Sequence, residues 1–105
     1  MSVSCTHDRS IPILSVQGRL DARGATAFDA ACKALPAEAS HVVVDLSGVD
    51  YISSIGIGSL MTAERALRKR HGRTILVGLA PFVSRILETT GVLRELKHLP
   101  TVPPR

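Results

Sequence analysis

Hydrophobic and polar positions alternate over the first twenty residues in a way that is typical of a β-hairpin. Val3 and Cys5 alternate with polar neighbours, the run HDRS resembles a turn, and residues 11–17 are apolar and extended. Pro12 cannot donate to a sheet ladder, so we expect it at the start or edge of its strand. The chain is therefore predicted to begin with two strands.

A helical pattern comes next. Asp21 is placed to cap the helix and Pro36 to end it. The apolar positions that recur at helical spacing between these two residues are Ala25, Phe28, Cys32 and Leu35.

The middle of the chain predicts a buried strand and a second helix. Residues 41–46, HVVVDL, are nearly all apolar, as in a central strand or one covered on both faces. The run SGVD then predicts a turn. A helix is expected from about residue 55 to His71, with Gly72 as its left-handed stop. Its apolar side is formed by Ile57, Leu60, Met61 and Leu67.

The C-terminal third continues the alternation of strand and helix. Residues 73–78 predict a strand, and PFVSRILETTG predicts a helix with Pro81 at its first turn and Gly91 after its end. Residues 92–99 leave room for a short last strand. The apolar face of the helix is assigned to Phe82, Val83, Ile86 and Leu87.

This order of elements predicts an α/β fold with a mixed sheet and helices mainly on one face. The 105 residues fit one domain, over residues 1–99, followed by a Pro-rich tail at 100–105. Apolar residues make up 45% of the chain and aromatic residues only 3%, so the core must be aliphatic.

Composition narrows the classes of partner. So few aromatic residues argue against a stacking platform for single-stranded nucleic acid. The net charge of +4 leaves nucleic acid, an anionic membrane and an acidic protein as options. No apolar run approaches the roughly 18 residues of a membrane span, and no secretory leader is evident. We therefore expect a cytoplasmic protein without membrane insertion.

No catalytic motif is recognisable, so an enzyme is not predicted. The cysteines and histidines do not cluster, which argues against a zinc site, and no cofactor is implied. Asp21, Asp45 and Asp50 are interpreted as caps and turns. The run GIG faintly resembles a dinucleotide loop, but Met61 stands near the place of the third glycine, so a small nucleotide-binding protein is a low-ranked alternative.

Two stretches remain open to a functional interpretation. The first is the basic end of the second helix, where Arg68, Lys69, Arg70 and His71 follow Glu64. It is either a patch for an acidic partner or a solvated helix end that complements the macrodipole. The second is SSIGIG at 53–58, and we expect Ser54 there to be a helix N-cap or a phosphate acceptor.

The glycines of this stretch favour a contact surface. Gly56 and Gly58 remove side chains from the first turn of the helix, so that another protein can approach the serine closely. A cap alone needs one hydroxyl and explains neither the second serine nor the glycines.

Three blocks of sequence resemble STAS domains of the anti-sigma-factor antagonist type. They are GRLDA at 18–22, DLSGVDYISSIGIG at 45–58 and PFVSRILETTGV at 81–92. Together they span most of the chain in the order of that family. The resemblance implies a STAS fold over residues 1–99 and a protein that binds rather than catalyses.

The resemblance also implies a switch. Ser54 matches the serine that accepts phosphate from an anti-sigma factor with serine kinase activity, with Ser53 as second choice. The unphosphorylated protein is expected to bind that factor and free a sigma factor for transcription, while the phosphorylated form lets go. A phosphatase is a further partner left open, and no direct nucleic-acid contact is expected. The implied partner surface consists of Asp21, Ser53, Ser54, Gly56, Ile57, Gly58 and Met61.

One departure from the family pattern supports a second interpretation. Ser53 stands where the family has an aspartate, so the residue before the acceptor is a hydroxyl without charge. This change favours an accessory STAS subunit that docks on the ATPase of a lipid-trafficking ABC transporter, for which no phosphate is needed.

Overall fold

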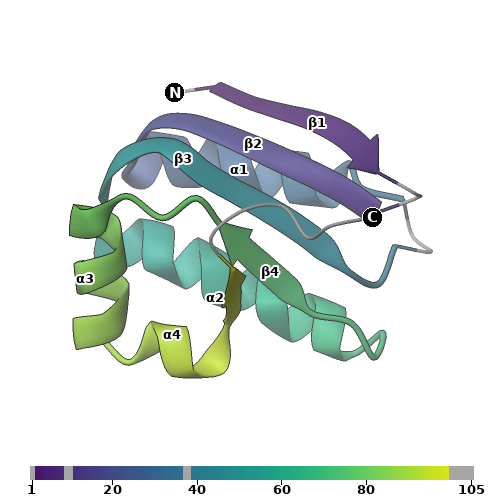
Figure 1. Ribbon diagram of the computed structural model, residues 1–105. Helices are drawn as coiled ribbons and strands as arrows, with labels where there is room; N and C mark the ends of the chain where they lie inside the picture. The colour runs from purple at the N-terminus through teal and green to yellow at the C-terminus, as the bar shows by residue number, and fades with distance from the viewer. Residues whose placement is uncertain (1, 9–10, 37–38, 100–105) are drawn as a thin grey trace.

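The computed structural model describes residues 2–8, 11–36 and 39–99 and shows one mixed sheet with four helices (Figure 1). Strands β1 (Ser2–Asp8) and β2 (Ile11–Leu20) form the predicted hairpin, with Pro12 near the start of β2 as expected. The predicted turn HDRS is too long, because His7 and Asp8 belong to β1 and pair with β2. Residues 9–10 and the tail at 100–105 lie outside the described residues.

Beyond the hairpin, strands and helices alternate as the sequence predicted as far as α3 (Pro81–Thr89). The short helix Val92–Glu95 that follows was not predicted, and the expected last strand is confined to Lys97–Leu99. The elements are α1 (Ala22–Lys33), β3 (Val42–Ile52), α2 (Ser54–Arg68), β4 (Thr74–Val77), α3 (Pro81–Thr89), α4 (Val92–Glu95) and β5 (Lys97–Leu99).

The sheet has the strand order β1-β2-β3-β4-β5, with β1 antiparallel to β2 and all other neighbours parallel. The predicted mixed sheet is therefore confirmed. Helices α1 and α2 lie behind it in Figure 1, and α3 stands beyond the ends of β2 and β3. The connections place the starts of α1, α2 and α3 at the carboxyl ends of parallel strands, which is the edge where ligands and partners of such sheets usually bind.

The main core is aliphatic and fills the space between the sheet and the helices. Phe28 is its single aromatic member and is fully buried. A second, smaller cluster lies on the other face of the sheet and contains Ile13, Val43, Ile75 and Val77. Since β3 and β4 have apolar residues on both faces, their nearly continuous apolar runs are explained by two-sided burial.

The predicted turn at SGVD is wrong, because these residues continue β3. Ser15 and Gln17 of β2 are two residues apart, but their partners in β3, Asp45 and Gly48, are three residues apart. β3 therefore contains an extra residue at this point, which forms a bulge. Such a bulge bends a strand without ending it, which is why the polar run resembled a turn in the sequence.

The end of α2 also differs from the prediction. The helix ends at Arg68 rather than His71, and the left-handed residue that follows is His71, with a φ of 61°. Gly72 has another role. A Cβ atom there would lie 1.8 Å from the carbonyl oxygen of Ser40, so the glycine allows two backbone segments to touch.

The third helix agrees with its predicted boundaries. Pro81 occupies its first turn, and Gly91 follows it with a φ of 80°. Val83 and Leu87 are fully buried and Ile86 is partly buried. The assignment of Phe82 to the buried face was wrong, because half of its surface is exposed.

Candidate functional site

The two adjacent serines occupy different positions at the start of α2. Ser53 is the N-cap residue, and its Oγ accepts a hydrogen bond from the backbone N–H of Gly56 at 3.3 Å. Ser54 is the first helical residue and is exposed. Of the two alternatives for Ser54, the helix cap is excluded, because Ser53 holds that position one residue earlier. Its hydroxyl makes no hydrogen bond to any residue that the structure describes, so it is accessible for chemistry.

The cap is also tied to the end of β2. The backbone N–H of Ser53 donates to the carbonyl oxygen of Leu20 at 3.0 Å, and the Ser53 hydroxyl lies 3.4 Å from the same oxygen. Asp21 follows Leu20 directly and caps α1, where its carboxylate accepts from the backbone N–H of Gly24 at 3.2 Å. The starts of α1 and α2 therefore meet at one place, and the predicted site residues Asp21, Ser53 and Ser54 are brought together.

The negative charge of Asp21 on this surface is offset by neighbouring groups. The hydrogen bond from Gly24 and the nearby Arg19 guanidinium lower the pKa of Asp21 below its ordinary value. Arg19 lies 3.9 Å from the Asp21 carboxylate and also stacks on the ring of Tyr51, 4.1 Å from its centroid. The first turn of α2 contains no acidic residue. A phosphate at this helix terminus therefore meets partial positive charge and no neighbouring carboxylate within the turn.

The two glycines of SSIGIG differ in role. Gly58 is exposed, and a Cβ atom there would meet nothing within 4 Å, as expected for an open contact surface. Gly56 is buried, and its Cβ atom would lie 2.3 Å from the Leu20 carbonyl oxygen. Gly56 therefore has a packing role in place of the expected surface role, since it allows α2 to start against β2.

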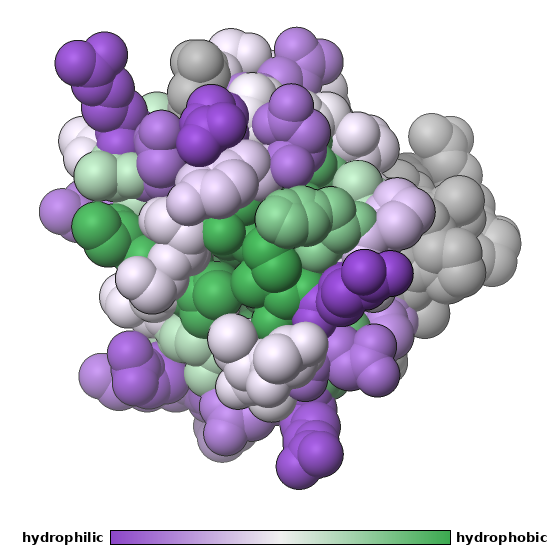
Figure 2. Space-filling model, turned by 90° about the vertical axis from the view of Figure 1, so that its left-hand side faces the viewer, coloured by the Kyte–Doolittle hydropathy of each residue, from purple (hydrophilic) through white to green (hydrophobic). Residues whose placement is uncertain are grey.

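The rest of the predicted partner surface lies along α2. Ile57 and Met61, one turn apart, are partly buried and pack against the core. Sequence reasoning missed two exposed apolar side chains at this edge, Ile55 at 55% exposed and Phe82 at 50%. Figure 2 looks onto this side of the molecule and shows apolar side chains gathered within a polar surround. The signal in the sequence was the position of Ile55: an isoleucine directly after two serines, in the first turn of a helix.

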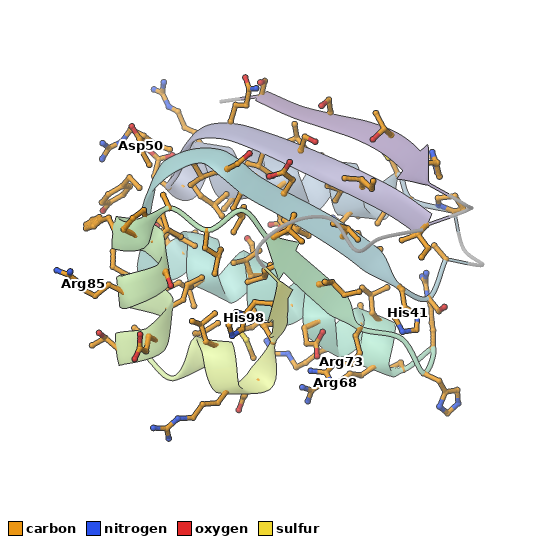
Figure 3. The ribbon with its side chains drawn as sticks, in the orientation of Figure 1. His41, Asp50, Arg68, Arg73, Arg85 and His98 are labelled. Carbon is orange, nitrogen blue, oxygen red and sulfur yellow. The ribbon has the colours of Figure 1, made fainter. Side chains whose placement is uncertain are left out.

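The basic end of α2 is built differently from its sequence interpretation. Glu64 is completely buried, and its carboxylate accepts three hydrogen bonds of 2.7 Å, from Arg68 Nε, Arg73 Nε and the backbone N–H of Thr74. Burial alone raises the pKa of Glu64, but these three donors outweigh it and lower the pKa below the ordinary value. Both arginines also donate to the carbonyl oxygen of Glu95 and lie side by side in Figure 3.

Two of the cations near this end are therefore structural. Arg68 and Arg73 tie α2 and β4 to the end of α4. Arg65 on α2 and Lys69, which caps the end of α2, remain exposed and have no ion pair among the described residues. Among those residues, none of the helices is long and apolar enough to cross a membrane.

Comparison with known proteins agrees with this architecture. Residues 3–99 match the family described as "Mlab, STAS domain". The anti-sigma-B factor antagonist of Listeria monocytogenes is 32% identical over 87 residues, which cover 80% of this chain and 76% of that protein.

Solved structures show the same fold. An anti-sigma factor antagonist from Mycobacterium paratuberculosis superposes with a TM-score of 0.86 at 26% identity, covering 96% of this chain and 86% of that one. The anti-sigma factor antagonist SpoIIAA in its unphosphorylated form gives a TM-score of 0.73 at 16% identity, covering 96% and 90%. Since the family match spans nearly all of the described residues and the fold agrees, this chain belongs to the STAS domain family.

Proposed function

We propose that this protein is an anti-sigma factor antagonist whose switch is the phosphorylation of Ser54. The observation that carries the proposal is the separation of the two serine roles. Ser53 is engaged as the cap, whereas Ser54 is exposed at the first position of the helix with an accessible hydroxyl. This answers why two serines are needed, since one maintains the helix start and the other is left for modification.

The proposed partner is an anti-sigma factor with serine kinase activity. In the unphosphorylated state the protein binds that factor and releases a sigma factor for transcription. Similarity to antagonists such as the one from Listeria monocytogenes supports this assignment. The protein acts as a kinase substrate in the cytoplasm rather than as an enzyme, and a phosphatase resets it.

The physical effect of the phosphate falls on binding. A phosphoserine adds about −1.5 to −2 charges. At a helix N-terminus this charge is compatible with the fold and is worth a few tenths to about 1 kcal/mol in favour of the helix. In a closely packed protein contact the same charge costs several kcal/mol, because it is desolvated without a partner.

The test is incubation with the cognate kinase and ATP, followed by mass spectrometry of the modified peptide. Ser54→Ala should retain binding and resist phosphorylation, while Ser53→Ala, the matched control, should still accept phosphate. Ser54→Asp should weaken binding to the kinase with little change in melting temperature. Phosphate found on Ser53 would overturn the assignment of the acceptor.

A second function is supported by one observation, the absence of a carboxylate at position 53. In this alternative the surface at the start of α2 docks on the ATPase of a lipid-trafficking ABC transporter without any phosphate. Absence of phosphate on both serines, together with co-purification with such an ATPase, would select it.

A further inference from the structure

The sheet has a free edge at β1. This strand is the first in the sheet order, and among the described residues no strand pairs with its outer side. Figure 1 shows β1, in purple, along the top margin of the molecule. Its backbone N–H and C=O groups on that side are therefore available to another strand. Neither a helix nor a loop covers its side chains, since five of them are exposed: Ser2, Ser4, Cys5, Thr6 and His7.

This edge lacks the usual protection against pairing. Proteins commonly shield an edge by a short strand, a bulge, a proline or a charged side chain. β1 has seven residues, and its pairing with β2 runs from Ser2–Gln17 to Asp8–Ile11 without a shift in register. It contains no Pro, Lys or Arg, although the chain has 13 Lys and Arg residues. The strand at the opposite edge, β5, is only three residues long. β1 is therefore the edge that is built to accept a partner.

The sequence of β1 suits pairing with a second copy of itself. In an antiparallel pair over the whole strand, the residues of one copy meet those of the other in reverse order. Cys5 is the central residue, so it faces Cys5 of the second copy, and Ser4 faces Thr6. Serine and threonine can hydrogen-bond across strands, and no two charged residues face each other in this pairing. A two-fold axis through Cys5 thus satisfies both free edges at once.

We propose that two copies of this chain associate through β1, antiparallel and centred on Cys5, so that their sheets join into one continuous sheet. The interface contains one strand from each copy and is smaller than that of a permanent dimer. We therefore expect a reversible dimer with a dissociation constant of roughly 100 µM. The proposal goes beyond the proposed switch and does not depend on Ser54.

The first test is sedimentation equilibrium of the reduced protein over a concentration series from roughly 10 µM to roughly 1 mM, which brackets the expected constant. The average mass should rise from 11.2 kDa toward twice that value. Hydrogen exchange over the same series should slow at backbone amides of residues 2–8 as the dimer forms.

Substitutions at Cys5 test the register of the pairing. Cys5→Lys places two ammonium groups opposite each other and should weaken association about fivefold. Cys5→Ser keeps a small polar side chain and should associate like wild type. Gln17→Lys is the matched control, because it adds the same charge at an exposed position of β2, one strand away from the edge. It should leave association unchanged.

The thiols provide a geometric test of the same pairing. Residues directly opposite in an antiparallel pair have Cα atoms about 4.5–5.5 Å apart, which lies within the span of about 4.4–6.8 Å that a disulfide requires. Diamide accepts two electrons and two protons from two Cys5 thiols and should join the copies through one S–S bond. Cys5→Ser should not cross-link. Cys32→Ser should cross-link like wild type, because Cys32 is partly buried and burial raises the pKa of its thiol to about 12.

Several results would overturn the proposal. They are a mass that stays at 11.2 kDa throughout, equal association of Cys5→Lys and Cys5→Ser, and a dimer that forms without protection of residues 2–8. Cross-linking that requires Cys32 would place the interface elsewhere, and would also refute it. A monomer whose β1 amides are protected only by an unrelated strand-forming peptide would assign the edge to another protein instead.

A last comparison separates this proposal from the switch. Ser54→Ala should dimerise like wild type, and Cys5→Lys should still bind the proposed anti-sigma factor. Loss of dimerisation in Ser54→Ala with a native melting curve would contradict an interface at β1.

Discussion

The backbone N–H of Ser53 donates to the carbonyl oxygen of Leu20 at 3.0 Å and thereby joins the end of β2 to the start of α2. The two residues are far apart in the sequence, yet this bond decides which serine becomes the cap. It also places Asp21, which follows Leu20, beside the start of α2. The surface that carries Ser54 is therefore built by two separate segments of the chain.

The two serines should differ in their effect on stability. Ser53→Ala removes a capping hydrogen bond and should cost about 1 kcal/mol. Ser54→Ala changes an exposed side chain and should stay within about 0.5 kcal/mol of wild type. Urea denaturation of both variants measures the difference. Equal losses would contradict the assignment of Ser53 as the cap.

The two glycines form a second matched pair. Gly56→Ala places a methyl group 2.3 Å from the Leu20 carbonyl oxygen and should destabilise the protein by about 1–3 kcal/mol. Gly58→Ala meets no neighbouring atom and should stabilise the helix by up to about 1 kcal/mol. Thermal melts followed by circular dichroism distinguish them, and changes of the same sign would refute the packing role of Gly56.

Because one face of α2 is buried, truncation of Leu60 should cause a large loss of stability. This side chain is fully buried, so Leu60→Ala should cost about 2–5 kcal/mol. Phe82 is half exposed, and Phe82→Ala serves as the control with a clearly smaller expected loss. Chemical denaturation tests both. A Leu60→Ala loss of only a few tenths of a kcal/mol would rule out the observed packing of α2.

Glu64 predicts a specific dependence of stability on pH. Because its pKa is lowered in the folded state from the ordinary 4.5, its contribution is fully present above pH 4.5. That contribution is lost as the pH falls through the lower folded pKa. Glu64→Gln should destabilise the protein at pH 7 by about 1–3 kcal/mol, because three charge-assisted hydrogen bonds are weakened, while the two arginines stay partly solvated.

The control for this prediction is Glu88→Gln, which changes an exposed carboxylate on α3. The free energy of unfolding should be measured between pH 3 and pH 7 for wild type and both variants. The wild-type curve should fall more steeply below pH 4.5 than that of Glu64→Gln. Parallel curves would mean that Glu64 does not contribute through its charge.

Two exposed cations near the end of α2 predict an effect on association rate. If Arg65 and Lys69 steer an acidic partner, reversing both charges should slow association and reduce its salt dependence. Arg68 is unsuitable for this test because it binds Glu64. Stopped-flow measurements with the proposed anti-sigma factor partner at low salt supply the rate, and an unchanged rate would leave these residues as a solvated helix face.

The sequence by itself determined the order of elements as far as α3, and the mixed sheet. These follow from local rules, since periodicity along the chain reports which side of an element is buried. The ends of α3 were also predicted correctly, because Pro81 and Gly91 act on the backbone locally. The family resemblance was likewise carried by contiguous residues and is confirmed.

Only the tertiary structure decided what individual residues do within that frame. The difference between Gly56 and Gly58 depends on the Leu20 carbonyl, and the burial of Glu64 depends on Arg73 and Thr74 in β4. Likewise, SGVD continues a strand because β2 lies alongside it. These effects cannot be predicted from the residues next to each position in the sequence. The atoms responsible belong to distant residues and come within contact distance only when the sheet assembles.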